Sequence, residues 1–223
     1  MTSSRWHAHG NVYLVAESSE YTMDAGLDGV LEVLEIDGDD VRIAIVNPDG
    51  SLAEMSGNGT RIAGAWLIDR TGSTMARVHV GSRVVEVRRV AHRLYESDIG
   101  DVEVGLRQIV EGIQLTAVSV GNPHAVVVGD PNDLPRIGPL LETHPQFPNR
   151  TNVQVVRVDA PGEVTARVWE RGVGETSASG SSAVAIAAAT HGEGEVRVRF
   201  PGGDLHVRLH DGRATLTGPA EPV

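Results

Sequence analysis

The sequence has 223 residues, a formal net charge of −11, a pI near 5.2 and no cysteine. An acidic chain lacks the clustered Lys and Arg that neutralise phosphates, which argues against a nucleic-acid partner. No stretch approaches the roughly 18 apolar residues of a membrane span, and the opening MTSSRWHAHG lacks the order of a signal peptide, so we expect a cytoplasmic protein. Without cysteine there is neither a disulfide nor a thiolate metal site, and a packed core must hold the fold.

Short Val-rich runs with alternating apolar residues predict β-strands along most of the chain. In chain order these runs are 41–46, 83–90, 165–170, 195–200 and 205–209, with Gly-containing turns near several of them. Two Ala-rich segments break this pattern. Residues 59–70 and 181–191 are each long enough for about three helical turns, and both predict helices buried against a sheet.

The same order of parts occurs twice, which predicts two similar halves. A Gly-Asn pair precedes an apolar run at 10–15 and again at 121–128, and a Ser-Gly turn opens each Ala-rich helix, at 56–57 and at 179–180. Chance recurrence of glycine-containing turns is the alternative explanation. We expect one half to comprise residues 1–107 plus 216–223 and the other 108–215, with an active site in the cleft between them.

Two helix N-termini that converge on one cleft suggest an anion site. The first N–H groups of a helix have no internal partner and carry partial positive charge. Neither a P-loop nor a dinucleotide fingerprint is present, so a small carboxylate fits better than a nucleotide. Ser56 and Ser179 would then lie near opposite faces of the carbon that bears the carboxylate, an arrangement suited to proton transfer at an α-carbon.

Five ordered motifs carry a resemblance to a known family. They are HAHGN (7–11), NPDGSLAEMSGNGTR (47–61), GNPHAVV (121–127), FPNRTNV (147–153) and ERGVGETSASGSSA (170–183). Together they resemble diaminopimelate epimerase, a cofactor-independent enzyme that inverts one α-carbon of diaminopimelate. The resemblance implies an α+β fold of two pseudo-symmetric halves of mixed sheet, each wrapped around a central helix. It also implies a role in making precursors of lysine and peptidoglycan.

By this resemblance, two groups act on opposite faces of the α-carbon and convert the LL isomer to the meso isomer. Those groups are cysteines in the family and Ser56 and Ser179 here, with His124 and Glu170 assisting them. The implied substrate contacts are Asn11, Asn47, Gly57, Asn58, Asn122, Asn152, Arg171, Gly180 and Ser181. Neither pyridoxal phosphate nor a metal is implied, the partner is the amino-acid substrate, and a homodimer is allowed.

The sequence also departs from the family pattern around its first motif. Ala8, Val12 and Tyr13 stand where the family usually shows Gly, Asp and Phe, and Gly29 stands where a polar substrate contact is sometimes found. These changes bear on substrate identity more than on fold.

Serine at both catalytic positions changes the expected activity. If an alcohol lies roughly five pKa units above a thiol, forming the base costs about 7 kcal/mol more, a penalty on the order of 10⁵-fold. We therefore expect this chain to be weakly active or inactive. Three explanations stay open: the serines replace native cysteines, the chain is a related isomerase or dehydratase with Glu170 or His124 as base, or it binds amino acids without turnover.

Several candidate residues also have a purely structural interpretation. Ser56 and Ser179 are good helix N-caps, and Asn11, Asn122 and Asn152 suit turns. His124 could be a buried, hydrogen-bonded imidazole, and Glu170 with Arg171 a surface pair. The pair His7 and His9 has no third ligand and does not predict a metal site. The three tryptophans, Trp6, Trp66 and Trp169, are expected in the core.

Overall fold

The computed structural model describes residues 3–223, and the chain divides into two compact units. One unit runs up to Ile99 and includes Thr217–Val223, and the other is Gly100–Leu216. The chain leaves the first unit within β7 (Leu94–Asp101) and returns to it within β16 (Arg213–Pro219). The second unit begins eight residues before, and ends one residue after, the range 108–215 expected from the sequence.

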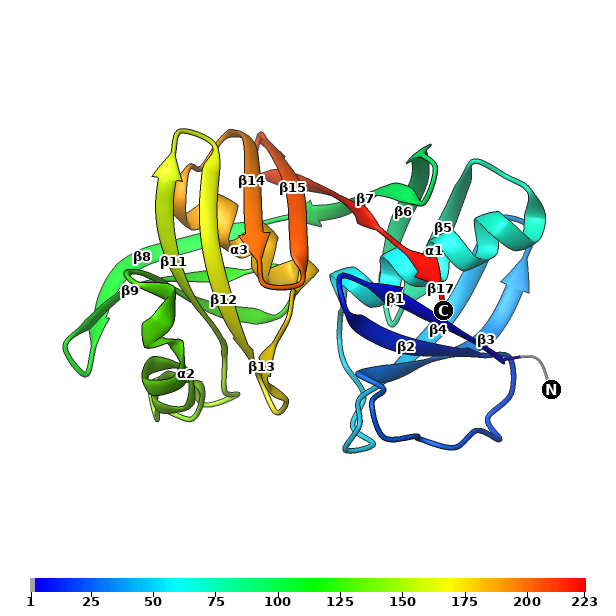
Figure 1. The fold of residues 1–223 in the computed structure, drawn as a ribbon, viewed down its shortest axis with the longest axis horizontal. Helices are drawn as coiled ribbons and strands as arrows, with labels where there is room; N and C mark the ends of the chain where they lie inside the picture. The colour runs from blue at the N-terminus through cyan, green and yellow to red at the C-terminus, as the bar shows by residue number, and fades with distance from the viewer. Residues whose placement is uncertain (1–2) are drawn as a thin grey trace. The chain divides into compact units, whose positions relative to one another are not determined.

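The first unit is a mixed sheet around one helix (Figure 1). Its strands are β1 (Ser3–Ala8), β2 (Asn11–Ala16), β3 (Gly29–Asp37), β4 (Asp40–Val46), β5 (Met75–Val80), β6 (Arg83–Ala91), β7 and β17 (Glu221–Pro222), and its helix is α1 (Gly57–Thr71). Pairing runs β17-β1-β2-β3-β4-β5-β6-β7, and only β2 with β3 and β4 with β5 are parallel. The last strand of the chain therefore completes the edge of the first sheet.

The second unit repeats this plan with one helix added. Its elements are β8 (Glu103–Val110), β9 (Ile113–Ser119), β10 (Pro123–Val128), η1 (Pro131–Asp133), α2 (Leu134–Glu142), β11 (Asn152–Ala160), β12 (Glu163–Glu170), β13 (Gly174–Thr176), α3 (Gly180–Thr190), β14 (Gly194–Phe200), β15 (Gly203–His210) and β16. Pairing runs β8-β9-β10-β11-β12-β14-β15, with β13 as a short antiparallel addition to β12. Only β10 with β11 and β12 with β14 are parallel.

The first seven strands of the first pairing order match the seven of the second, so β2 corresponds to β10, β3 to β11 and β4 to β12. The register matches as well: Tyr13 lies opposite Gly29, and His124 lies opposite Asn152. The predicted α+β fold of two pseudo-symmetric halves is confirmed, and so are the five predicted strands.

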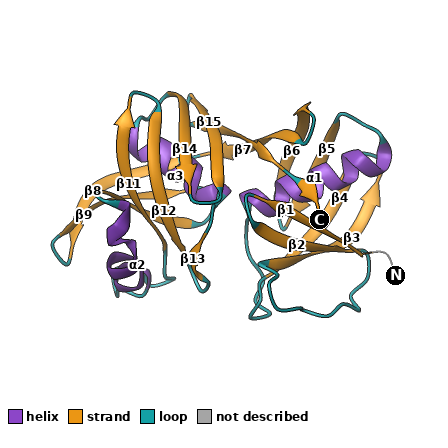
Figure 2. Cartoon of the chain, viewed as in Figure 1, coloured by secondary structure: helices purple, strands orange, loops and turns teal. Residues whose placement is uncertain are grey.

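Each unit has a central helix, α1 in the first and α3 in the second (Figure 2). Twelve of the fifteen residues of α1 and nine of the eleven of α3 are buried, so neither helix exposes a face to solvent. Both lie where the Ala-rich segments predicted them, and each begins one or two residues earlier than expected. Trp6 and Trp66 are buried and Trp169 packs partly buried against the second core, as predicted.

The helix α2 was not predicted, because its sequence LPRIGPLLE contains two prolines and a glycine, which are poor helix formers. Tertiary packing outweighs this preference. Leu134, Ile137 and Leu141 join a buried cluster with Val153 and Val155 of β11. Among residues 3–223, no helix combines the length and the apolar character that crossing a membrane requires.

Close approach of α1 to its sheet depends on Gly64. A Cβ at this position would lie 2.5 to 2.7 Å from the Cβ and Cγ atoms of Val87 on β6. We expect Gly64→Ala to lower the free energy of unfolding by about 1–3 kcal/mol, because the cost of overpacking the core with a methyl group exceeds the gain in helix propensity from alanine. Denaturant unfolding checks this. Adding Val87→Ala should recover part of the loss, and an unchanged or higher stability in the single variant would contradict this packing.

Candidate functional site

The two predicted catalytic serines both stand at helix N-termini and adopt the same extended backbone. Ser56 precedes α1 with φ −141° and ψ 117°, and Ser179 precedes α3 with φ −144° and ψ 127°. Their side chains differ. Ser56 Oγ accepts a hydrogen bond from the Gly59 N–H at 3.0 Å, whereas Ser179 makes no capping hydrogen bond with its side chain although it is buried. The N-cap interpretation therefore holds for Ser56 and does not account for Ser179.

A chain of buried polar groups lies beneath the start of α1. The Asn58 amide donates to Asn11 Oδ1 at 2.6 Å, and Asn58 Oδ1 accepts from the Arg61 guanidinium at 2.8 Å. Asn11 and Asn58, both predicted substrate contacts, are thus brought together with Gly57 and Ser56. Asn11 bonds another site residue across the fold, so it is not only a turn residue.

Arg61 is fully buried and is held by oxygen atoms of the unit. It donates to the carbonyl of Pro219 at 3.0 Å and to that of Gly57 at 3.3 Å, besides Asn58. Burial lowers the pKa of Arg61 to about 10, so it stays charged at neutral pH. The sequence analysis included Arg61 in the motif 47–61 without giving it a role. Its buried hydrogen bonds, which hold the start of α1, were not predicted.

Tyr13 is a second site residue that sequence reasoning missed. Its hydroxyl lies 3.2 Å from Ser56 Oγ, and either oxygen can donate the hydrogen. The side chain is buried beside Gly29, where a Cβ would lie 2.9 Å from the Tyr13 ring and 2.8 Å from the Val46 carbonyl oxygen. The absence of a side chain at Gly29 thus leaves space for the phenol ring. The sequence could have indicated this pair, because Tyr13 and Gly29 both depart from the family pattern.

In the second unit, His124 is buried in a network of amide and hydroxyl groups. Its Nε2 pairs with Asn122 Oδ1 at 2.9 Å, and its Nδ1 pairs with the Gln154 amide at 3.0 Å. The Gln154 amide also donates to Ser182 Oγ at 3.0 Å. Because Asn122 Oδ1 can only accept, the hydrogen resides on Nε2 and Nδ1 accepts from Gln154.

The electrostatic surroundings keep His124 neutral. Burial, with a further contribution from the nearby charge of Arg171, lowers the pKa of His124 from 6.5 to about 3. With both ring nitrogens hydrogen-bonded and the neutral form favoured, His124 is poorly placed to take up a proton at neutral pH. Asn122 also reaches toward Ser181 of α3, at 3.5 Å between Nδ2 and Oγ.

Asn152 holds two segments of backbone together. Its amide donates to the Pro123 carbonyl at 2.9 Å, and its Oδ1 accepts from the Arg171 backbone N–H at 2.9 Å. The Arg171 guanidinium donates to the Asn149 carbonyl at 3.3 Å. These contacts fix the backbone where β12 ends, and both join Asn152 of β11 to residues distant in the sequence, so the turn interpretation does not describe them.

The same loop is anchored by Glu142, a buried carboxylate that sequence reasoning missed. It accepts hydrogen bonds from the Trp169 indole at 2.8 Å and from the Gly172 backbone N–H at 2.7 Å, and it pairs with Arg150. Glu142 ends α2, so the helix that the sequence did not reveal also positions the loop that carries Glu170 and Arg171.

Two predicted residues engage their own local surroundings. Glu170 Oε1 accepts from the Thr176 hydroxyl at 2.6 Å across the β12–β13 hairpin. The Asn47 amide donates to Ser51 Oγ at 2.9 Å within the turn that follows β4. Both side chains are intermediate in exposure, which leaves part of each accessible.

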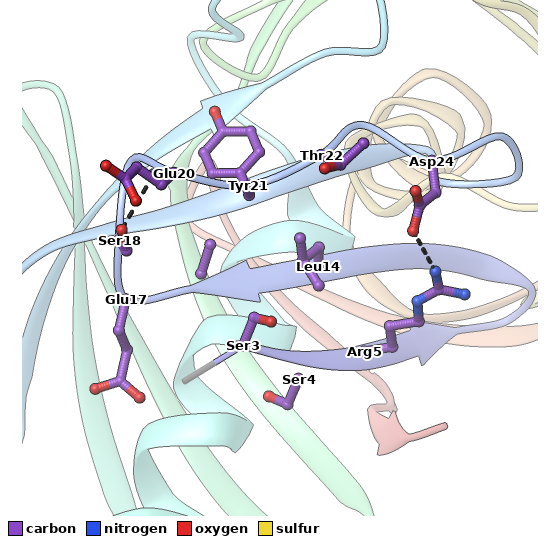
Figure 3. Close-up of a pocket in the computed structure, with 11 residues that line it drawn as sticks. Ser3, Ser4, Arg5, Leu14, Glu17, Ser18, Glu20, Tyr21, Thr22 and Asp24 are labelled. Atoms are coloured by element: carbon purple, nitrogen blue, oxygen red, sulfur yellow. Dashed lines mark hydrogen bonds and ion pairs between the residues drawn. The ribbon is translucent and has the colours of Figure 1, made fainter. Parts of the chain in front are cut away.

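An open hollow elsewhere in the first unit is separate from these residues (Figure 3). It is lined by β1, β2 and the segment that follows β2, and Arg5 pairs with Asp24 across it at 2.6 Å. None of the residues that line it is a predicted site residue. Within residues 3–223, the only grouping of three side chains with metal-ligand spacing is Glu193, His210 and Asp211, all exposed, and neither His7 nor His9 belongs to it.

Comparison with known structures defines the class of the fold. The chain is similar to a predicted epimerase from Pseudomonas aeruginosa, with a TM-score of 0.75 at 19% identity over 99% of this chain and 96% of that one. It is equally similar to a hydroxyproline epimerase from Agrobacterium vitis, with a TM-score of 0.75 at 16% identity over 99% and 88% of the two chains. The chain thus has the fold that these two proteins share.

Sequence comparison narrows the class. The family model for diaminopimelate epimerase matches residues 116–223. The diaminopimelate epimerase of Desulfitobacterium hafniense is 38% identical over 89% of this chain and 81% of its own length. That of Synechocystis sp. is 32% identical over 100% of this chain and 97% of its own. The chain belongs to the diaminopimelate epimerase family, a family of isomerases, as the five motifs indicated.

The difference between the two serines predicts different costs of removing them. Ser56→Ala should lower the free energy of unfolding by about 1 kcal/mol, the usual value of a side-chain cap. Ser179→Ala should cost less, because no capping hydrogen bond is lost. Denaturant unfolding of the two variants and the unmodified protein measures this. Equal losses would contradict the distinction between a capping and a non-capping serine.

The buried, neutral state of His124 predicts a specific dependence on pH. The folded protein binds a proton at His124 only near pH 3, whereas the unfolded chain binds one near pH 6.5, so the free energy of unfolding falls as the pH drops from 6.5 toward 3. The NMR shift of the His124 ring should stay constant from about pH 8 to pH 5, over which exposed histidines titrate. His124→Gln identifies the signal, and a midpoint near the ordinary value would refute the buried neutral assignment.

Proposed function

We propose that this protein epimerises diaminopimelate between the LL and meso isomers without a cofactor, slowly, because serine stands at both catalytic positions. The observation that carries the proposal is the matched pair of serines at the N-termini of α1 and α3, with the same backbone conformation in two units of the same topology. Membership of the diaminopimelate epimerase family supports the substrate. The product is a precursor of lysine and peptidoglycan.

The substrate carboxylate is proposed to bind at the helix N-termini. Backbone N–H groups at Gly57 and Asn58 of α1, and at Gly180 and Ser181 of α3, belong to first turns whose donors have no intrahelical partner. Arg171 is proposed to meet the distal carboxylate, for which a guanidinium has the right fork geometry. Asn11, Asn47, Asn122 and Asn152 are proposed to surround the distal end, in addition to the local hydrogen bonds that they make.

The proposed chemistry is a proton transfer on each face of one α-carbon. One serine oxygen takes the α-proton, the electron pair is held on the carbon beside the carboxylate, and the other serine delivers a proton from the opposite face. An alcohol is a far weaker acid than a thiol, so this base is rarely formed at neutral pH. The serine pair therefore supports a rate well below that of a cysteine pair.

The hydrogen bonds of His124 favour one assignment of the assisting groups. Its ring donates to Asn122 and accepts from Gln154, and its pKa is lowered to about 3 by burial. We therefore propose that His124 positions the neighbouring network and does not take up the α-proton. Of the two alternative bases, Glu170 is the better placed, since its carboxylate is partly exposed whereas His124 is buried.

The proposed location and partners follow from the substrate. Diaminopimelate is a small, soluble metabolite, so we propose that the protein acts in the cytoplasm on a free amino acid. The net charge of −11 fits a protein without a nucleic-acid partner. A homodimer remains a prediction.

Exchange of the substrate α-hydrogen in D₂O tests the proposal. Each diaminopimelate stereoisomer is incubated with the protein and with Ser56→Cys/Ser179→Cys, and proton NMR follows loss of the α-hydrogen signal. We expect slow exchange with the serine form and exchange at least about 100-fold faster with the double variant, because a thiol is deprotonated far more readily than an alcohol.

Binding is measured in the same samples by the ligand-induced rise in melting temperature. A rise without exchange in either form would indicate an amino-acid binder. Exchange by the serine form that is lost in Glu170→Gln and unaffected by the cysteine substitutions would indicate a related isomerase with Glu170 as base. If diaminopimelate causes neither a rise in melting temperature nor exchange of its α-hydrogen, it is excluded as the substrate.

A further inference from the structure

The hydroxyl of Tyr13 and the oxygen of Ser56 form a hydrogen-bonded pair at the start of α1. Their oxygens are 3.2 Å apart, and Ser56 Oγ also accepts the Gly59 N–H at 3.0 Å. A serine oxygen has two lone pairs and one hydrogen. When Tyr13 donates, both lone pairs are occupied and the serine hydrogen is left to be donated to a bound substrate.

The fold provides space for this tyrosine. A Cβ on residue 29 would lie 2.9 Å from the Tyr13 ring, so a larger side chain there would displace the phenol. Glycine at this position leaves the ring against the sheet, with its hydroxyl at Ser56. Tyr13 and Gly29 face each other in register on the parallel strands β2 and β3.

The second unit has a different group at the corresponding place. His124 and Asn152 face each other on β10 and β11 in the same register, but the imidazole binds Asn122 and Gln154. A titratable ring thus occupies the same place in both units, and in the first unit it contacts the serine directly. This asymmetry suggests a chemical role for Tyr13 beyond packing.

We propose that Tyr13 is a positioning residue that exchanges its proton with Ser56, so that the pair replaces the single thiol of a cysteine. This inference rests on the proposed function, since it describes how one serine of the pair gives and takes the substrate α-proton.

The proton balance is the same in both directions. As an acid, Ser56 gives its hydrogen to the α-carbanion to form the C–H bond, while Tyr13 O–H passes its proton to the serine oxygen and becomes a phenolate. As a base, Ser56 gives its hydrogen to the Tyr13 phenolate while its oxygen takes the proton from the α-carbon, whose C–H electron pair remains on carbon. No alkoxide persists in either direction.

General acidities indicate why such a pair would help. Phenols titrate near 10 and thiols near 8.5, so at neutral pH a phenolate is about 30-fold scarcer than a thiolate. An isolated alkoxide is scarcer on the order of 10⁵-fold, for a difference of roughly five pKa units. If Tyr13 is the group that ionises, the basic form of the pair is therefore about 30-fold scarcer than a thiolate, and not about 10⁵-fold scarcer as for an isolated serine.

The test compares Tyr13→Phe in two backgrounds, the serine form and Ser56→Cys/Ser179→Cys, by α-hydrogen exchange in D₂O. Phenylalanine keeps the ring and removes only the hydroxyl. We expect exchange at least about 30-fold slower in the serine form, and within about threefold of the parent in the cysteine form, where the thiol needs no phenol. Tyr21→Phe, elsewhere in the same unit, is the matched control and should change neither rate.

The outcomes separate this proposal from the proposed function. Equal slowing by Tyr13→Phe in both backgrounds would show a structural role and overturn the proton exchange, and so would no slowing in the serine form. Exchange by the cysteine form with none by the serine form would overturn the Tyr13 proposal and the slow activity proposed for the serine form, and would leave diaminopimelate as the ligand of the site. No exchange by either form would overturn the proposed function, and the Tyr13 proposal with it.

Discussion

The buried guanidinium of Arg61 is the contact on which the start of α1 depends. It joins the first turn of the helix through Gly57 and Asn58 to the last strand of the chain through the Pro219 carbonyl. Its partners are carbonyl oxygens, and burial lowers its pKa to about 10 without removing its charge. Because a buried charge is costly unless its hydrogen bonds are made, the helix end, Asn58 and the returning C-terminal segment stabilise one another.

The two units share a topology and differ in the side chains at corresponding positions. Both helices are buried, begin after an extended serine and lie beside the same succession of parallel and antiparallel strands. In the first unit a phenol reaches the serine, and in the second a neutral imidazole is tied to two amides. The repeated topology thus places a serine before the central helix of each unit, while the side chains at corresponding register positions differ.

Patterns local in sequence predicted most of the fold. Alternating valines predicted strands, and two Ala-rich segments predicted the buried helices α1 and α3. The helix α2 escaped prediction because Pro135, Gly138 and Pro139 oppose helix formation locally, and its burial against β11 is visible only in three dimensions. The motifs indicated the residues at the starts of α1 and α3, and their catalytic and binding roles stay predictions. Tyr13, Gln154 and Glu142 act through partners distant in the sequence, so no local pattern revealed them.

In the proposed reaction, two groups act on opposite faces of one α-carbon. The origin of the hydrogen in the product is the measurement to make: the LL isomer is converted in D₂O, and both isomers are recovered early in the reaction for mass and NMR analysis. We expect deuterium at the inverted carbon of the meso product, while the recovered LL isomer keeps its hydrogen. A meso product that retains the original hydrogen would show a single base and refute a reaction on two faces.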